Sequence, residues 1–138
     1  MMQDSSRGMS HSSVTTGSQP NFKGNKGLKR LLLATGYSMQ GFIAGWKHEA
    51  AIRQELVCTA LLVPLAVYLG NTSIERILMI GSVLLVLLVE LLNSAIEAVV
   101  DRIGTEPNEL SKRAKDMGSA AVFVALTIVI VTWGDVLF

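Results

Sequence analysis

Hydrophobic residues along the chain fall into three long runs, separated by short polar stretches. The runs cover about residues 50–70, 74–100 and 117–136. A helix that crosses a membrane needs about 20 mainly apolar residues. The pattern therefore predicts an all-α membrane protein with three transmembrane helices.

A shorter amphipathic segment precedes the first run, over about residues 28–48. Its apolar residues recur at a helical period on one face: Leu28, Leu31, Leu32, Met39, Phe42, Ile43 and Trp46. Basic residues such as Lys29 and Arg30 lie elsewhere around the helix. A basic amphipathic helix with Trp and Phe on its apolar side suits a membrane surface.

Two further segments complete the outline of the chain. Residues 1–26 are rich in Ser, Gly, Thr and Gln and contain no apolar run, which predicts a disordered polar tail before a membrane domain at residues 27–138. Between the first two spans, Thr72 and Glu75 stand three residues apart, the spacing of a capping box that opens the next helix.

Composition supports one lipid-solvated domain. The chain has 138 residues, of which 50% are hydrophobic, and its mean hydropathy is +0.45. A net charge of +1 gives no indication of nucleic-acid binding. The single cysteine, Cys58, lies in an apolar run, and we expect it to pack as a small hydrophobic residue.

The placement of basic residues predicts the orientation in the membrane. Lys and Arg are frequent before the first span and in the loop at 101–116, whereas the connection between the first two spans has only Arg76. Cytoplasmic loops carry the excess of Lys and Arg. The N-terminus and the 101–116 loop are therefore expected in the cytoplasm.

Polar residues form a stripe at the end of the second run. Glu90, Asn93, Glu97 and Asp101 are spaced so that all four lie on one side of a helix. A charge at the membrane centre costs about 2.5–3.5 kcal/mol on insertion scales. A basic partner, a cation or water in a cleft must offset the cost of these carboxylates.

Other charged residues are expected at the same depth. Glu49 and Glu55 precede the first span, and Lys115 with Asp116 opens the third. Mg²⁺ prefers hard oxygen ligands and is often held by one or two carboxylates plus substrate phosphates. A lysine can hold a phosphate while a further carboxylate accepts a hydroxyl proton. The pattern therefore indicates a magnesium-phosphate site.

Two other interpretations stay open at this point. The acidic residues could form ion pairs between helices, with Arg53, Arg102, Arg113 and Lys115 as partners. They could also form a non-enzymatic proton or cation pathway, although acids gathered toward one side favour a surface site. The sequence has neither a P-loop nor a G-x-G-x-x-G motif, so any nucleotide must bind differently.

The polar segments also resemble a known family, the small bacterial membrane diacylglycerol kinases. The resemblance covers about residues 27–133 and rests on four stretches: Ala34–Ser38, Glu49–Glu55, Val89–Arg102 and Glu109–Ala121. It implies a homotrimer in the bacterial inner membrane that transfers the γ-phosphoryl group of MgATP to 1,2-diacylglycerol, giving phosphatidic acid at the cytoplasmic face. Relatives that phosphorylate undecaprenol would share the acidic stripe, so that lipid remains an alternative substrate.

The resemblance also implies roles for individual residues. By position, Glu90 resembles the catalytic base and Asn93 supports it. Glu49 and Glu97 resemble the carboxylates that hold Mg²⁺ with the ATP phosphates, and Lys115 and Asp116 belong to the nucleotide side. The remaining matches are substrate-binding or supporting positions: Arg30, Thr35, Glu55 and Ser119.

Overall fold

The computed structural model of the chain describes residues 27–104 and 106–138. The elements within these ranges are α helices: α1 (Leu28–His48), α2 (Ala50–Leu69), α3 (Ser73–Ile103) and α4 (Glu109–Leu137). α2, α3 and α4 are long and apolar enough to cross a membrane. The predicted fold class, three membrane-length helices preceded by a further helix, is confirmed. The tail predicted at residues 1–26 lies outside the described residues.

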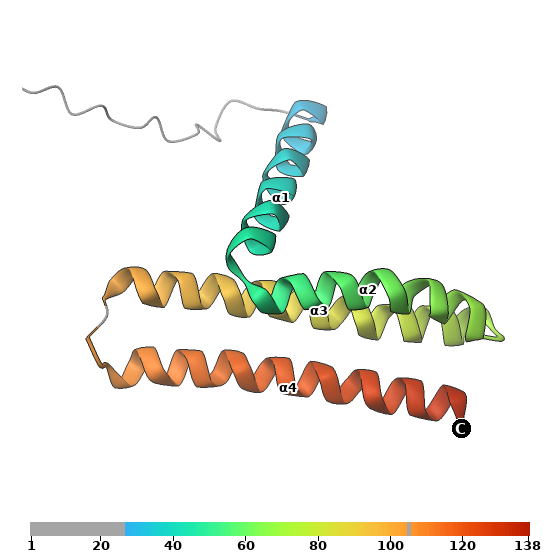
Figure 1. The fold of residues 1–138 in the computed structure, drawn as a ribbon. Helices are drawn as coiled ribbons and strands as arrows, with labels where there is room; N and C mark the ends of the chain where they lie inside the picture. Colours follow the sequence, from blue (N-terminus) through green and yellow to red (C-terminus); the bar gives the residue numbers. More distant parts are fainter. Residues whose placement is uncertain (1–26, 105) are drawn as a thin grey trace, which may run out of the picture.

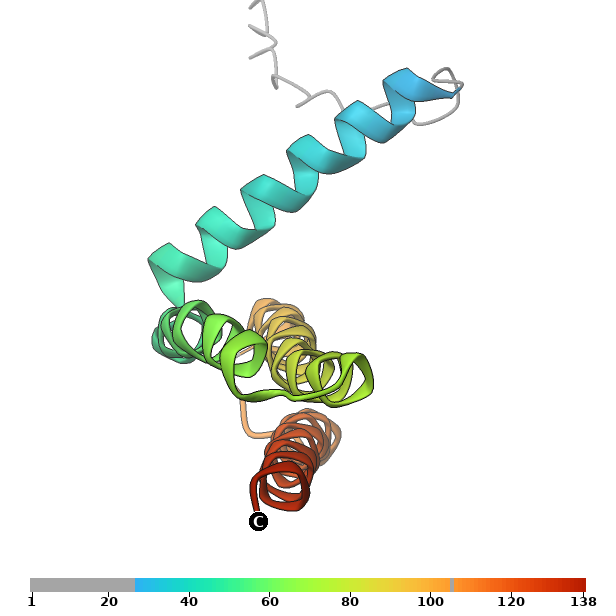
Figure 2. The same cartoon turned by 90° about the vertical axis from the view of Figure 1, so that its right-hand side faces the viewer.

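The first helix, α1, stands away from the other three. Figure 1 and Figure 2 show it leaving the bundle at the start of α2, with its N-terminal end farthest from the bundle. Lys47 and His48 occupy its last turn, where a positive charge is favourable beside the helix dipole. Its large apolar side chains are open to the surroundings; Leu32 and Trp46 are 65% and 48% exposed. Such a helix can lay its apolar side on a membrane surface.

The turn between α2 and α3 is tight and fully capped. Thr72 Oγ1 accepts a hydrogen bond from the Glu75 backbone N–H at 3.2 Å, and Glu75 Oε2 accepts one from the Thr72 N–H at 3.3 Å. The predicted capping box is therefore confirmed. Arg76 Nε donates to the carbonyl oxygen of Gly70 at 2.9 Å, which ties the start of α3 to the end of α2.

The central element of the bundle is α3, which packs against both α2 and α4. In the near end-on view of Figure 2, α2 and α4 lie on different sides of α3. Most of the buried residues therefore come from α3: Met79, Ser82, Val83, Val86, Leu87, Glu90, Asn93 and Val100. The outward faces of α2 and α4 keep exposed apolar side chains such as Leu61 and Phe123, as expected for contact with lipid or another chain.

Polar residues extend α3 and α4 beyond the apolar runs. α3 continues to Ile103, past Asp101, and α4 begins at Glu109, eight residues before the predicted third span. The Asn108 side chain accepts hydrogen bonds from the N–H groups of Leu110 and Ser111 at 2.8 and 3.2 Å. This N-cap starts α4 in the polar segment, because capping does not depend on hydrophobicity. Charged side chains on both helices are thereby held in regular helical positions at one end of the bundle.

Candidate active site

Two polar residues of α3 are buried in the bundle next to the acidic end of the helix. The side chains of Glu90 and Asn93 have only 7% and 8% of their surface exposed. Their three-residue spacing places them on one face of α3, as the sequence predicted. Glu97 follows on the same face and is partly exposed, and Asp101 is exposed. The stripe thus runs from a buried carboxylate to an accessible one.

Asn93 connects this stripe to α4. Its Nδ2 group donates a hydrogen bond of 3.1 Å to Glu97 Oε1, which fixes the orientation of both side chains. Its amide oxygen, Oδ1, is buried without a hydrogen-bond partner and lies against Gly118, where a Cβ atom would overlap it. The absence of a side chain at Gly118 therefore allows α4 to approach Asn93 closely.

Three other carboxylates lie close enough to Glu90 for their charges to act on it: Glu49, Glu55 and Glu97. In the part of the chain that the structure describes, none of these four residues forms an ion pair. Of the possible partners Arg53, Arg102, Arg113 and Lys115, only Lys115 forms an ion pair with an acid of the stripe in the described chain, and that acid is Asp101. The four carboxylates therefore have no ion-pair partner from the described helices.

Glu49 lies at the corner between α1 and α2. It ends one helix and begins the next: its N–H donates to the carbonyl oxygen of Gly45 at 2.8 Å, and its carbonyl oxygen accepts from the Arg53 N–H at 3.3 Å. The guanidinium of Arg53 also donates to the Trp46 carbonyl oxygen at 3.0 Å. Ile52, with 1% of its surface exposed, packs against Gly45. These contacts fix the corner and with it the backbone position of Glu49.

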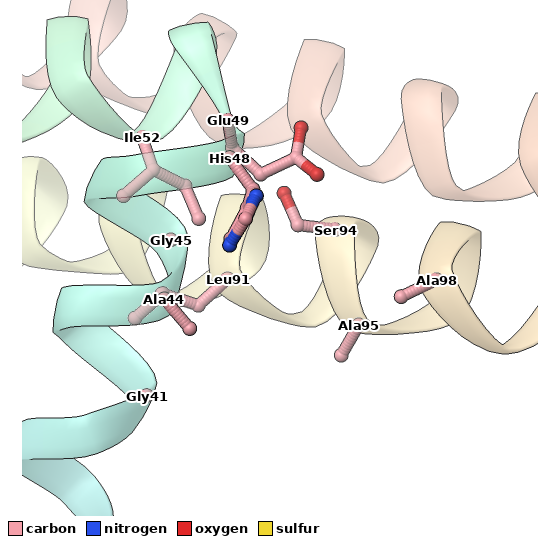
Figure 3. A pocket seen from close by; sticks show the side chains of 10 residues that line it. All are labelled: Gly41, Ala44, Gly45, His48, Glu49, Ile52, Leu91, Ser94, Ala95 and Ala98. Carbon is pink, nitrogen blue, oxygen red and sulfur yellow. The ribbon is translucent and has the colours of Figure 1, made fainter.

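A pocket of about 510 Å³ opens beside this corner. It is lined by small and apolar residues of α1, α2 and α3, and its polar members are His48, Glu49 and Ser94. Figure 3 shows the side chains of Glu49 and Ser94 among those that line it. Ala95 and Ala98 of α3 also line the pocket. Glu49 is the one acidic residue in a mainly apolar lining.

The basic group of the site comes from α4. Lys115 Nζ donates a hydrogen bond of 2.6 Å to Asp101 Oδ1 on α3, so the two helices are joined by an ion pair near their connection. Asp116 and Ser119, also on α4, are exposed. Lys115 therefore lies beside the acidic stripe as predicted, with its ammonium group bound to the outermost acid of that stripe.

The structure does not bring every predicted residue to this place. Arg30 and Thr35 belong to the N-terminal half of α1, the half that stands away from the bundle. Thr35 Oγ1 donates to the carbonyl oxygen of Leu31 in its own helix at 3.0 Å. Glu55 is partly buried and lines a second, smaller pocket with Cys58 and apolar residues of α3 and α4. The roles of these residues as substrate-binding or supporting groups remain predictions.

Sequence reasoning placed Asp101 on the stripe without assigning it a function, and it did not identify Gly118 as the contact of Asn93. The sequence does place Asp101 near the site, because it continues the helical spacing of Glu90, Asn93 and Glu97. The contact of Gly118 with Asn93 depends on how α4 is rotated against α3, and no local pattern reports that rotation.

A divalent cation such as Mg²⁺ is bound by several oxygen atoms around one point. Within the described ranges, no group of three or more His, Cys, Asp or Glu side chains is arranged to hold a metal ion. Mg²⁺ often takes only one or two protein carboxylates and completes its shell with phosphates and water. Glu49 and Glu97 supply carboxylates of that kind, without an ion-pair partner in the described chain. The residues fit a magnesium ion that binds together with phosphate groups.

Residues 36–137 match the family model described as prokaryotic diacylglycerol kinase. The chain is 58% identical over 116 residues to a protein of Pseudomonas aeruginosa named diacylglycerol kinase, covering 84% of this chain and 94% of that protein. It is 56% identical over 107 residues to the diacylglycerol kinase of Escherichia coli, covering 78% and 88%.

A relative with lower sequence identity matches a similar length of the chain. The diacylglycerol kinase of Helicobacter pylori is 42% identical over 109 residues, which cover 79% of this chain and 85% of that protein. The family match includes the corner at Glu49, the whole acidic stripe and Lys115. Arg30 and Thr35 precede its first matched residue.

Proposed function

The chain belongs to the prokaryotic diacylglycerol kinase family, and we propose that it transfers the γ-phosphoryl group of MgATP to 1,2-diacylglycerol, giving phosphatidic acid. One observation carries the proposal. Glu90 is buried beside Asn93 in a membrane-length helix, with Glu49, Glu55 and Glu97 as its charged neighbours. A lipid hydroxyl and a water-borne phosphate donor can meet only at such a place, where the apolar and aqueous regions adjoin.

Glu90 is proposed as the general base. Phosphoryl transfer to an alcohol requires removal of the hydroxyl proton, and a positioned carboxylate can accept it. Glu90 is more deeply buried in the bundle than Glu97 and Asp101 on the same helix face. Asn93 orients this part of the stripe through its hydrogen bond to Glu97. A bound diacylglycerol would therefore place its hydroxyl group at Glu90 while its acyl chains remain among apolar residues.

The remaining residues are proposed to hold the phosphate donor. Glu49 and Glu97 would hold the magnesium ion, and Lys115 would bind a phosphate oxygen with its ammonium group. When bound, the ion would neutralise the negative charge of the phosphates. Asp116 and Ser119 lie on exposed positions of α4, beside Lys115, where water-soluble nucleotide can reach them. The chain's contribution is thus to orient both substrates and to accept one proton.

The family and the three apolar helices make the chain a bacterial membrane protein. We further propose that it lies in the inner membrane with its N-terminus and the 101–116 loop in the cytoplasm, because basic residues concentrate in those segments. ATP is available on that side. The site residues Glu97, Lys115 and Asp116 adjoin this loop, which places the proposed reaction at the cytoplasmic face.

A homotrimer is also part of the proposal. Large apolar side chains on α2 and α4 are exposed in a single chain, and Arg30 and Thr35 belong to the half of α1 that stands away from the bundle. Association of copies would cover the apolar side chains of α2 and α4. It would also bring Arg30 and Thr35 to the site of a neighbouring chain. Each complete site would then contain residues of two chains.

The proposal is tested with the full chain in mixed micelles, by following phosphate transfer from MgATP to short-chain diacylglycerol and, separately, to undecaprenol. Formation of phosphatidic acid is the expected result. Transfer to undecaprenol alone would keep the site and change the lipid. If a folded sample transfers phosphate to neither lipid, the kinase proposal is wrong and a cation or proton pathway through Glu90 and Glu97 takes its place.

A further inference from the structure

The ion pair between Lys115 and Asp101 is the only one in residues 27–104 and 106–138. It joins the last turns of α3 to the second turn of α4, across the connection that separates these helices. The Nζ and Oδ1 atoms are 2.6 Å apart, and the two side chains are 40% and 65% exposed. The pair is therefore close but accessible to a nucleotide from water.

Lys115 has a second carboxylate within electrostatic reach. Its charge is influenced by Glu97 as well as by Asp101, yet no ion pair links it to Glu97 in the described part of the chain. The side chain of a lysine is a flexible four-carbon stem that ends in a compact charge. In the structure this group is bound to Asp101 and not to Glu97.

This choice matters for Glu97, which is held by Asn93 Nδ2 on one oxygen and is otherwise without an ion-pair partner among the described residues. An ammonium group bound to Glu97 would occupy the carboxylate and cancel its charge. A divalent cation would then have to displace the lysine first, which weakens its binding.

We propose that Asp101 is a positioning residue that holds Lys115 away from Glu97, so that the Glu97 carboxylate stays available to a divalent cation bound with nucleotide phosphates. The inference rests on the proposed function, which gives Glu97 and Lys115 their roles. Asp101 itself touches neither substrate. Lys115 retains further N–H groups while bound to Asp101, because an ammonium group has three donors, and these can reach a phosphate oxygen.

The test measures binding and needs no turnover. Mn²⁺ is titrated, with electron paramagnetic resonance, into the full chain in detergent micelles containing a non-hydrolysable ATP analogue. Asp101→Asn keeps the size and one acceptor oxygen but removes the charge. We expect it to weaken Mn²⁺ binding about three- to fivefold, the range of a partly exposed ion pair. Asp101→Glu should restore most of the affinity, and Glu106→Gln, an exposed acid of the same connection, should leave it unchanged.

A double-mutant cycle separates positioning from a structural effect. If Asp101 acts through Lys115, then adding Asp101→Asn to a Lys115→Met protein should cause no further loss of Mn²⁺ affinity. A loss of the same factor in both backgrounds would overturn the inference, as would unchanged Mn²⁺ binding by the Asp101→Asn protein. Glu97→Gln identifies a failure of the proposed function instead: if it binds Mn²⁺ as tightly as the unsubstituted protein, the metal assignment is wrong, and the inference falls with it.

Discussion

Gly118 of α4 lies directly against the amide oxygen of Asn93 in α3, and a Cβ atom on Gly118 would overlap that oxygen. The contact brings the two longest helices together at the level of the acidic stripe. Asn93 in turn holds Glu97 through its Nδ2 group. The position of the proposed metal-binding carboxylate therefore depends on the absence of a side chain in the neighbouring helix.

Gly118→Ala is expected to lower activity by displacing Asn93 from Glu97. The added methyl group must push the Asn93 side chain or separate the helices, and overpacking of this kind typically costs about 1–3 kcal/mol. Activity at saturating and at limiting Mg²⁺, together with thermal unfolding in detergent, measures both effects. Gly134→Ala is the matched control in the same helix, because a Cβ atom there meets nothing within 4 Å. Equal behaviour of the two variants would contradict the prediction.

Glu90→Gln is expected to remove phosphoryl transfer while leaving the helical fold intact. The two side chains have nearly the same shape, but the amide cannot accept a proton, and general-base catalysis contributes about 10²–10⁴-fold. Transfer to diacylglycerol is measured beside helix content by circular dichroism and oligomeric state by size-exclusion chromatography. Loss of assembly in the variant would make Glu90 a structural residue, and retained activity would exclude it as the base.

Glu97→Gln is expected to raise the Mg²⁺ concentration needed for half-maximal activity by about tenfold or more, since even residues outside the ligand set change metal affinity by about 10–100-fold. Gln retains an oxygen that can accept from Asn93 Nδ2, so the loss is one of charge. Initial rates over a range of Mg²⁺ at fixed ATP measure the shift. An unchanged magnesium dependence, equal to that of a Glu106→Gln protein, would count against the role of Glu97.

Gly45→Ala is expected to disturb the corner that places Glu49. A Cβ atom at this position would lie 2.8 Å from Ile52 Cδ1 and 3.1 Å from Ile52 Cγ2. Since Ile52 is almost fully buried, the side chain has little room to retreat, and α1 must shift. We expect an increase in the KM for ATP with a smaller change in kcat, because Glu49 is proposed to bind the nucleotide's metal rather than to take part in proton transfer.

The double variant Gly45→Ala with Ile52→Val provides the check on this explanation. Removal of Cδ1 makes room for the new methyl group, at a cost of about 0.5–1.5 kcal/mol for the shortened side chain. The KM for ATP should return toward the value of the unsubstituted protein. Gly36→Ala, in the same helix with open space around it, should leave KM unchanged. Failure of the second substitution to restore KM would show that the effect does not pass through Ile52.

The sequence alone determined the helices and the stripe. Long apolar runs require helices in a membrane, since every backbone polar group must be satisfied within the segment, and the spacing of Glu90, Asn93 and Glu97 fixes them on one face. The capping box at Thr72 and Glu75 is equally local, because it involves residues three positions apart. These features depend on neighbours along the chain, so they can be read from it.

Only the tertiary structure decided which residues meet across helices. The contact of Gly118 with Asn93, the packing of Ile52 on Gly45 and the choice of Asp101 as the partner of Lys115 all depend on how one helix is turned against another. That rotation is set by packing of many side chains at once, and small residues along a helix allow several solutions. For the same reason the sequence located the acidic stripe but did not decide which of its possible partners bind it.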